Sequence, residues 1–215
     1  MTGLKKLLMW KTASDGGGEP SEYQKVGYLI SVGQNANINT GVGNNPNLKI
    51  ACEFLLESYV QYVSPLGNFT SGKKGWRIIT SSQTALLVDT YSSGYAALLP
   101  PTGTVAGEKL NVVIDTEICK VTDRLGTYEK ASPEIEGTDN ISNIALGRNI
   151  VNASSSSSST SRMRIYSCKI WEGGTLIRDY IPVVRKSDSV AGFYDRANKT
   201  FNPSVSPVQF IAGND

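Results

Sequence analysis

The stretch MRIYSCKIWEGGTLIRDYIPVVRKSDSVAGFYDRANKTF (Met163–Phe201) is strongly patterned for β-structure. Two segments rich in β-branched and aromatic residues, 163–171 and 175–184, flank the pair Gly173-Gly174. A Gly-Gly pair between two such segments is typical of a β-hairpin, because glycine adopts the positive φ angles that a tight turn requires. We therefore predict two long antiparallel strands joined by this turn.

Alternating apolar residues extend the β pattern to most of the chain. Between residues 48 and 56, every second residue is apolar: Leu48, Ile50, Cys52, Phe54 and Leu56. A period of two indicates a strand with one face toward a core and the other largely toward water. Segments 26–32 and 110–114 show the same alternation, and we expect further strands at 76–81, 84–91, 118–123, 142–148 and 207–212.

No window of ten or more residues carries a helical apolar stripe. About a dozen short strands, separated by glycine- and proline-rich turns, predict an all-β protein with an antiparallel two-sheet sandwich or jelly roll.

Composition excludes several classes of function. The 215 residues carry a net charge of +2 and contain no histidine. A serine-histidine or cysteine-histidine catalytic unit therefore cannot form within this chain. We expect neither nucleic acid nor membrane as a partner, because Lys and Arg form no basic stripe and no stretch approaches the ~20 apolar residues of a membrane span. The glycine-rich stretches lack the pattern of a nucleotide-binding loop.

Three separated cysteines, Cys52, Cys119 and Cys168, form no CxxC motif. This spacing argues against a zinc or redox site, and we expect buried, reduced thiols that act as small apolar residues. One disulfide would require two of the three to meet in space.

Residues 1–20 differ in composition from the rest. Leu4, Leu7 and Leu8 recur at helical spacing, Trp10 follows, and a glycine-rich linker leads to Pro20. We expect residues 1–20 to form a docking segment with its linker, or alternatively a disordered tail or an edge strand, and residues 21–215 to form one domain. The serine run at 154–159 cannot bury apolar surface and is expected to form a loop.

Acidic residues offer two weak hypotheses of chemistry. Asp115 and Glu117 would point the same way on a strand, and their spacing would permit glycoside hydrolysis, although a solvent-facing pair at a strand end explains them as well. A calcium site could draw on oxygen ligands, but these do not follow the spacing of a calcium loop and otherwise cap their own turns. The residues concerned are Asp179, Asp188, Asp195 and Asn198.

Aromatic side chains are better binding candidates, because sugar rings pack their C–H faces on exposed aromatic rings. The candidate glycan-binding residues are Trp76, Tyr91, Tyr95 and Trp171, with Asn68, Arg77, Asp89 and Ser92 as polar neighbours. The alternative is that these rings fill the core of the sandwich. Tyr91 and Tyr95 flank a Ser-Ser-Gly loop and are the pair more strongly expected to be exposed.

The opening stretch also resembles the C-terminal signature of concanavalin A-like, laminin-G-type domains of gut bacteria and their phages. The resemblance rests on Arg164–Ile170, Gly173-Gly174, Leu176, Arg178-Asp179, Pro182, Gly192, Tyr194-Asp195, Asn198 and Phe201. Glu22–Val42 is similar to the opening strand of these domains, with Asn39 where the family has aspartate. The resemblance covers about residues 22–213 and implies a jelly roll in which the first and last strands lie side by side. It implies core positions for Tyr166 and Ile170, an ion pair or loop anchor at Arg178-Asp179, and a tight return around Asp195.

Together these features predict a bacteriophage virion structural protein without enzymatic activity. It would sit on a head fibre, capsid surface or tail, attached to other virion proteins by residues 1–20 and binding glycans on the host surface. Membership of the class of virion fibre proteins would imply a homo-oligomer, with a trimer as one form, assembled in the host cytoplasm. The alternative is a bacterial cell-surface carbohydrate-binding protein. Glycosidase activity would depend on Asp115 and Glu117 alone, because the Glu-x-Asp-x-x-Glu motif of glucanases in the family is absent.

Overall fold

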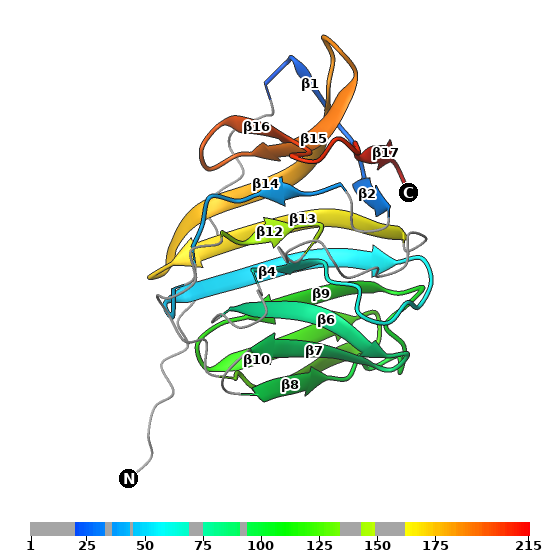
Figure 1. The fold of residues 1–215 in the computed structure, drawn as a ribbon, viewed down its shortest axis with the longest axis vertical. Coiled ribbons are helices and arrows are strands. Elements are labelled where there is room, and N and C mark those ends of the chain that lie inside the picture. The colour runs from blue at the N-terminus through cyan, green and yellow to red at the C-terminus, as the bar shows by residue number, and fades with distance from the viewer. Residues whose placement is uncertain are drawn as a thin grey trace.

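Two antiparallel β-sheets pack face to face in the computed structural model of this chain (Figure 1). The structure describes residues 20–32, 36–43, 45–68, 75–90, 94–133, 143–148 and 162–215. All regular elements within these ranges are strands. The all-β sandwich expected from the sequence is therefore confirmed.

Sheet A is the larger layer, and the described residues give it 11 strands. Its main order is β11-β10-β9-β4-β13-β14-β15-β16, while β2 pairs with β13 and β17, and β1 pairs with β14. Its strands are β1 (Tyr23–Lys25), β2 (Tyr28–Val32), β4 (Leu48–Leu56), β9 (Lys109–Ile114), β10 (Ile118–Asp123), β11 (Gly126–Ala131), β13 (Arg162–Glu172), β14 (Thr175–Arg185), β15 (Val190–Asp195), β16 (Thr200–Pro203) and β17 (Ile211–Gly213).

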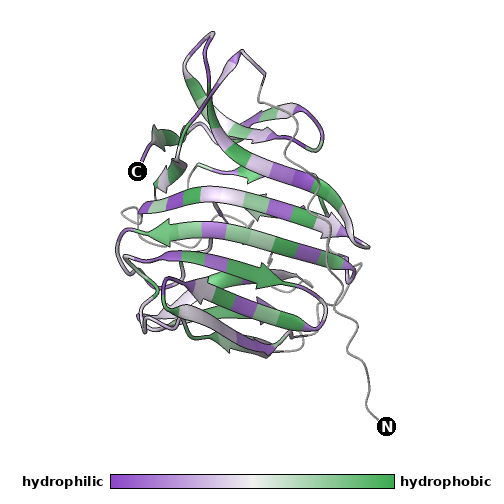
Figure 2. Ribbon diagram, turned by 180° about the vertical axis from the view of Figure 1, so that it is seen from behind, coloured by the Kyte–Doolittle hydropathy of each residue, from purple (hydrophilic) through white to green (hydrophobic). Residues whose placement is uncertain are grey.

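Sheet B, in the part of the chain that the structure describes, has six strands in the order β3-β12-β5-β6-β7-β8. They are β3 (Ile38–Asn39), β12 (Ala145–Leu146), β5 (Leu66–Gly67), β6 (Trp76–Ser82), β7 (Ala85–Thr90) and β8 (Gly94–Leu98). Seen from behind, the long strands of sheet A form the front layer of the molecule (Figure 2).

The predicted hairpin at Gly173-Gly174 is confirmed. β13 and β14 pair from Cys168 opposite Tyr180 to Glu172 opposite Thr175. Gly173 and Gly174 have φ angles of 53° and 85°, so both turn residues occupy the left-handed region that favours glycine. β13 also pairs with β4 along most of its length, which places the hairpin at the centre of sheet A.

Alternate residues of the strands build the core between the sheets. Along β4, buried residues alternate with half-buried ones, as the sequence predicted. The apolar cluster between the layers takes Phe54 and Ile165 from sheet A and Ile78 and Leu86 from sheet B. Each of these four side chains is shielded from water, so hydrophobic burial across the interface holds the sheets together.

β2 departs from the expected pattern of one buried and one wet face. Leu29 belongs to the main core, whereas Tyr28 and Ile30 pack with Tyr166 in a second cluster. β17 pairs with β2 at this point, and Tyr28 lies against Gly213. Both faces of β2 are therefore covered. Tyr166, expected in the core, is buried in this second cluster, while Ile170 belongs to the main core.

The Asp115–Glu117 hypothesis is wrong in its geometry. Asp115 follows the end of β9, and its Oδ1 accepts hydrogen bonds from the backbone N–H groups of Glu117 (3.0 Å) and Ile118 (2.9 Å). These residues form the turn between β9 and β10, so the carboxyl groups do not share a strand face. An aspartate that bonds to backbone two residues on is a common turn device.

All three cysteines are buried and free, as expected. Cys52 and Cys168 belong to the core face of sheet A and lie directly opposite each other on β4 and β13. In the described ranges, the structure has no helix with the length and apolar character that a membrane crossing would require. Residues 1–19 and the serine run lie outside the described residues, so the predicted division at residue 20 stays a prediction.

Candidate functional site

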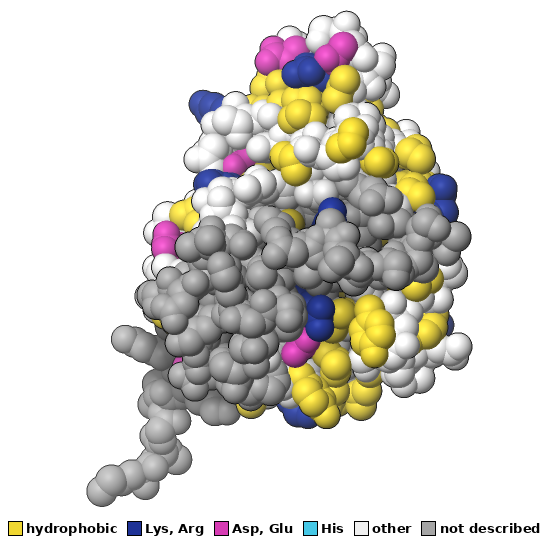
Figure 3. All heavy atoms as spheres, in the orientation of Figure 1, with side chains coloured by type: hydrophobic (Ala, Val, Ile, Leu, Met, Phe, Trp, Pro, Cys, Tyr) yellow, Lys and Arg dark blue, Asp and Glu magenta, His cyan; other side chains and the backbone are white. Residues whose placement is uncertain are grey.

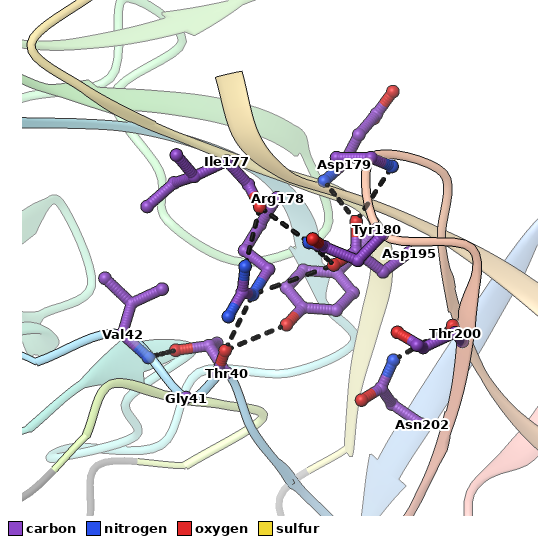
Figure 4. Close-up of polar contacts among 12 residues, drawn as sticks. Thr40, Gly41, Val42, Ile177, Arg178, Asp179, Tyr180, Asp195, Thr200 and Asn202 are labelled. Carbon is purple, nitrogen blue, oxygen red and sulfur yellow. Dashed lines mark hydrogen bonds and ion pairs between the residues drawn. The ribbon is translucent and has the colours of Figure 1, made fainter. Parts of the chain in front are cut away.

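The stretch Met163–Phe201 forms a buried polar network near its C-terminal end (Figure 4). Asp195 at the end of β15 is 1% exposed. Its Oδ1 accepts hydrogen bonds from the backbone N–H of Asp179 (2.9 Å) and of Ala197 (3.0 Å). Its Oδ2 accepts one from Asn198 Nδ2 (2.7 Å). Asp195 thus ties the turn after β15 to the neighbouring strand β14.

Arg178 extends the same network to sheet B. Its Nε donates to the carbonyl oxygen of Thr40 at 2.8 Å and lies 3.6 Å from Asp195 Oδ2. Thr40 follows β3, where Asn39 Oδ1 accepts a hydrogen bond from the backbone N–H of Gly41 (2.9 Å). Asn39 therefore holds this turn by a side-chain-to-backbone hydrogen bond, and the cation beside the turn is Arg178.

The proposed calcium ligands do not form one site. Asp188 pairs with Arg185 at 2.6 Å, while Asp179 pairs with Arg196 at 2.8 Å. Among the described residues, no group of three acidic, histidine or cysteine side chains is placed to hold a metal ion. Guanidinium groups occupy the positions next to these carboxylates, so the signature stretch has a structural role.

The outer face of sheet B brings together three of the residues that the sequence singled out. Arg77 on β6 lies opposite Asp89 on β7, and Asp89 lies opposite Tyr95 on β8. Directly opposed residues on antiparallel strands project to the same face. Their neighbours Ile78, Val88 and Ala96 point into the core, so Arg77, Asp89 and Tyr95 form a row on the outer face.

The row combines a fixed ion pair with an exposed ring. Arg77 Nε and Nη2 both donate to Asp89 Oδ2, at 3.0 and 2.8 Å. The two side chains are 21% and 24% exposed, so they are reachable from solvent yet held in place. Tyr95 is 66% exposed and offers its ring beside them.

Small and apolar residues lie next to this row. Leu87 on β7 is opposite Ala97 on β8, one pleat further along the same face, and both are half-buried. Leu99, just beyond β8, is 44% exposed. In the view of Figure 3, a basic and an acidic side chain lie together beside apolar side chains on the face of the molecule shown there. We use the name sheet B row for the whole surface, which comprises Arg77, Asp89 and Tyr95 together with their neighbours Leu87 and Ala97.

Trp76 does not fit the glycan-binding role expected of it. It is 0% exposed and belongs to the main core, because it alternates with Arg77 on β6 and points between the sheets. Asn68 is also buried, and its Oδ1 accepts a hydrogen bond from the backbone N–H of Trp76 at 3.1 Å. This amide extends the pairing of β5 with β6, so the role of Asn68 is to satisfy a backbone N–H group.

Trp171 lies on the other side of the sandwich. It pairs with Lys49 across β13 and β4, where the neighbours Ile50 and Ile170 fill the core. The Trp171 ring is half-buried, with Lys49 Nζ 5.8 Å from its centroid. Trp171 and Tyr95 therefore cannot contact one sugar together. Tyr91 and Ser92 lie outside the described residues, as do Leu4, Leu7, Leu8 and Trp10, for which a docking role was predicted.

Sequence reasoning missed Leu87 and Ala97 as members of this surface. The available signal was the period of two along β7 and β8, which places them on the face of Asp89 and Tyr95. No pattern within one strand could align the three strands with one another.

The comparisons with known proteins find similar structures but no similar sequences. No family model matches the chain, and neither does any curated protein. Alginate lyase A1-II', a member of polysaccharide lyase family 7, is similar over 63% of this chain and 65% of its own, with 13% identity and a TM-score of 0.35. A doubly substituted form of that lyase in complex with substrate gives 12% identity and a TM-score of 0.33, over 66% of this chain and 63% of its own.

The fold is established by the chain's own strands: the two antiparallel sheets confirm the all-β sandwich expected from the sequence. The expected virion structural protein without enzymatic activity is contradicted, because the similar structures are polysaccharide lyases. The match spans less than two thirds of each lyase, and we transfer neither their substrate nor their residue roles. The expected partners, oligomeric state and location stay predictions.

Proposed function

We propose that this chain recognises a carbohydrate on the outer face of sheet B, at the sheet B row. The observation that supports this is the alignment of an exposed tyrosine with a fixed arginine–aspartate pair across three adjacent strands. A sugar ring has apolar C–H faces and a rim of hydroxyl groups. The Tyr95 ring suits the first, and the donors and acceptors of Arg77 and Asp89 suit the second.

Rigidity favours this surface over a mobile loop. The three side chains stand on paired strands, and the ion pair restrains Arg77 and Asp89 before any ligand arrives. Less conformational entropy is then lost on binding, which raises affinity for a given set of contacts. Leu87 and Ala97 are half-buried beside the ring on the same face and add apolar surface next to it.

The test is binding to an array of bacterial and plant polysaccharides, followed by titration calorimetry with the strongest ligand. Tyr95→Ala should weaken binding at least about fivefold, which corresponds to ~1 kcal/mol for a lost ring contact. Trp171→Ala removes a half-buried ring from the opposite face and serves as the matched control, with expected affinity unchanged. Reducing ends and absorbance of unsaturated sugars, followed in the same samples, separate binding from cleavage.

Loss of binding in Trp171→Ala with unchanged binding in Tyr95→Ala would place the site on sheet A and overturn the proposal. Circular dichroism of each variant distinguishes a lost contact from a lost fold.

A further inference from the structure

We propose that the sheet B row selects neutral sugars with neighbouring hydroxyl groups and discriminates against uronates and sulfated sugars. This inference rests on the function proposed above and adds the class of ligand. It starts from the charge of the row. Arg77 is its single cation and Asp89 its single anion, and the two lie 2.8 Å apart.

Asp89 neutralises the positive charge of Arg77, which would otherwise attract an anionic sugar. An unpaired arginine binds carboxylates and sulfates well, because its planar fork matches two oxygens at once. Here the Nε and Nη2 edge of the fork is already directed at Asp89 Oδ2. An arriving carboxylate would have to displace Asp89 or lie close to it, and like charges at short range repel.

The same pair suits neutral hydroxyl groups. A hydroxyl both donates and accepts, so two adjacent hydroxyls can donate to a carboxylate oxygen and accept from a guanidinium N–H. The two hydrogen bonds that Arg77 donates to Asp89 both end on Oδ2, and the described residues place no hydrogen-bond donor on Oδ1. Hydrogen bonds to charged partners are stronger than neutral ones, so this arrangement favours a neutral diol.

The experiment measures binding of a neutral β-glucan and of a polyuronate at 20 and about 300 mM salt, a range over which exposed charges become screened. For the wild type we expect the neutral polymer to bind more tightly, with little dependence on salt. Asp89→Asn should weaken neutral binding about fivefold or more and strengthen polyuronate binding in a salt-dependent manner. The double variant Arg77→Gln/Asp89→Asn removes both charges and should lose that gain.

The outcomes separate the two proposals. If the wild type binds polyuronate more tightly than the neutral polymer, and Tyr95→Ala weakens that binding, the class of ligand is wrong while the site stands. If neither Tyr95→Ala nor Asp89→Asn changes any binding, the site itself is wrong. Melting temperatures of all variants ensure that the comparison is made on folded protein.

A second, independent observation concerns the cysteines. Cys52 and Cys168 are direct partners across β4 and β13, and both lie on the core face of sheet A. Opposed residues of antiparallel strands have Cα atoms about 4.5–5.5 Å apart, within the usual span of a disulfide, about 4.4–6.8 Å. Cys119 lies on β10, where its Sγ donates to the backbone oxygen of Lys130 (3.6 Å).

We infer that Cys52 and Cys168 form the site at which this chain is oxidised to an internal disulfide. The two thiols lose two protons and two electrons as the S–S bond forms, and a thiol oxidant such as diamide takes up both, its N=N bond becoming a hydrazine. Burial raises the pKa of the Cys119 thiol to about 11, and the neighbouring Cys52 and burial raise that of Cys168. Oxidation should therefore be slow at neutral pH and faster near pH 9.

The test is diamide treatment of the folded protein at pH 9, at temperatures up to a few degrees below its melting point. We expect the titratable thiols in denaturant to fall from three to one, and peptide mapping to join residue 52 to residue 168. Cys119→Ser should leave this cross-link intact, whereas Cys52→Ser should abolish it. A cross-link through Cys119, or three intact thiols after treatment of a protein that retains its fold, would overturn the inference.

Discussion

Replacing Asp195 by alanine should be one of the most destabilising single changes at a polar position of this chain. The substitution removes three hydrogen bonds, from the backbone N–H groups of Asp179 and Ala197 and from Asn198. It also leaves Arg178, whose side chain is 24% exposed, without its nearest anion.

The expected loss of stability depends on the polar groups that the substitution leaves without a partner. A buried N–H without a partner costs about 1–3 kcal/mol, and the Asp179 N–H lies in a residue that is 6% exposed. Breaking a buried ion pair costs about 3–5 kcal/mol when one charge is left uncompensated. Water partly reaches Arg178 and Asn198, so we expect a total loss of about 3–5 kcal/mol.

Urea denaturation followed by circular dichroism measures this loss. With a slope of about 2–3 kcal/mol per molar, the midpoint should fall by roughly 1–2.5 M. Asp188→Ala is the matched control, because Asp188 pairs with Arg185 at the surface, where its side chain is 42% exposed. That pair should contribute at most about 1 kcal/mol. Equal midpoints for the two variants would refute the assignment of Asp195 as an anchor of the fold.

Three further predictions test packing and charge. Trp76→Ala should cost about 3–5 kcal/mol by calorimetry, because its ring is fully buried, whereas Tyr95→Ala should cost less than about 0.5 kcal/mol. Gly67→Ala should lower the free energy of unfolding by about 1–3 kcal/mol, because the new Cβ would lie 2.7 Å from Arg77 Cα. Gly43→Ala is its control and should be nearly neutral, because a Cβ there meets nothing within 4 Å. Burial raises the pKa of Glu57, but hydrogen bonds from Arg164 and Arg162 outweigh it and hold the pKa below 4.5. Glu57→Gln should therefore be less stable than the wild type at pH 7, and the difference should shrink as pH falls below 4.5; a constant difference from pH 7 to 3 would contradict the assignment.

The sequence predicted those parts of the fold that depend on local chemistry. The glycine pair at 173–174 sets a turn by its own conformational freedom, and the alternation along β4 follows from one buried face. The sequence could not decide which face of β6 points into the core, because the adjacent residues Ile78 and Ile79 are both apolar. In the structure both are shielded from water. The face that carries Trp76 is set by packing across the sandwich, which no single strand records.

The candidate site shows the same limit. Arg77, Asp89 and Tyr95 were each singled out, but their alignment in a row depends on the register between three strands. The β6–β7 pairing shifts register between Thr80 and Ser82, next to the turn that joins them. A slip of one residue would send Asp89 toward the core. The residue patterns of the separate strands did not predict that irregularity.

The pairing of β4 with β13 has a consequence for how the chain reaches this structure. β4 ends at residue 56 and β13 begins at residue 162, and the backbone N–H of Gly27 bonds to Asn214 Oδ1 across 187 positions. Partners so far apart in sequence close large loops before any contact compensates the lost entropy, which slows folding. On the ribosome, β6, β7 and β8 can pair as soon as they emerge, because they are neighbours in sequence. β4 keeps one edge unpaired until β13, residues 162–172, has been synthesised. During that interval its unpaired backbone N–H and C=O groups can pair with the wrong strand.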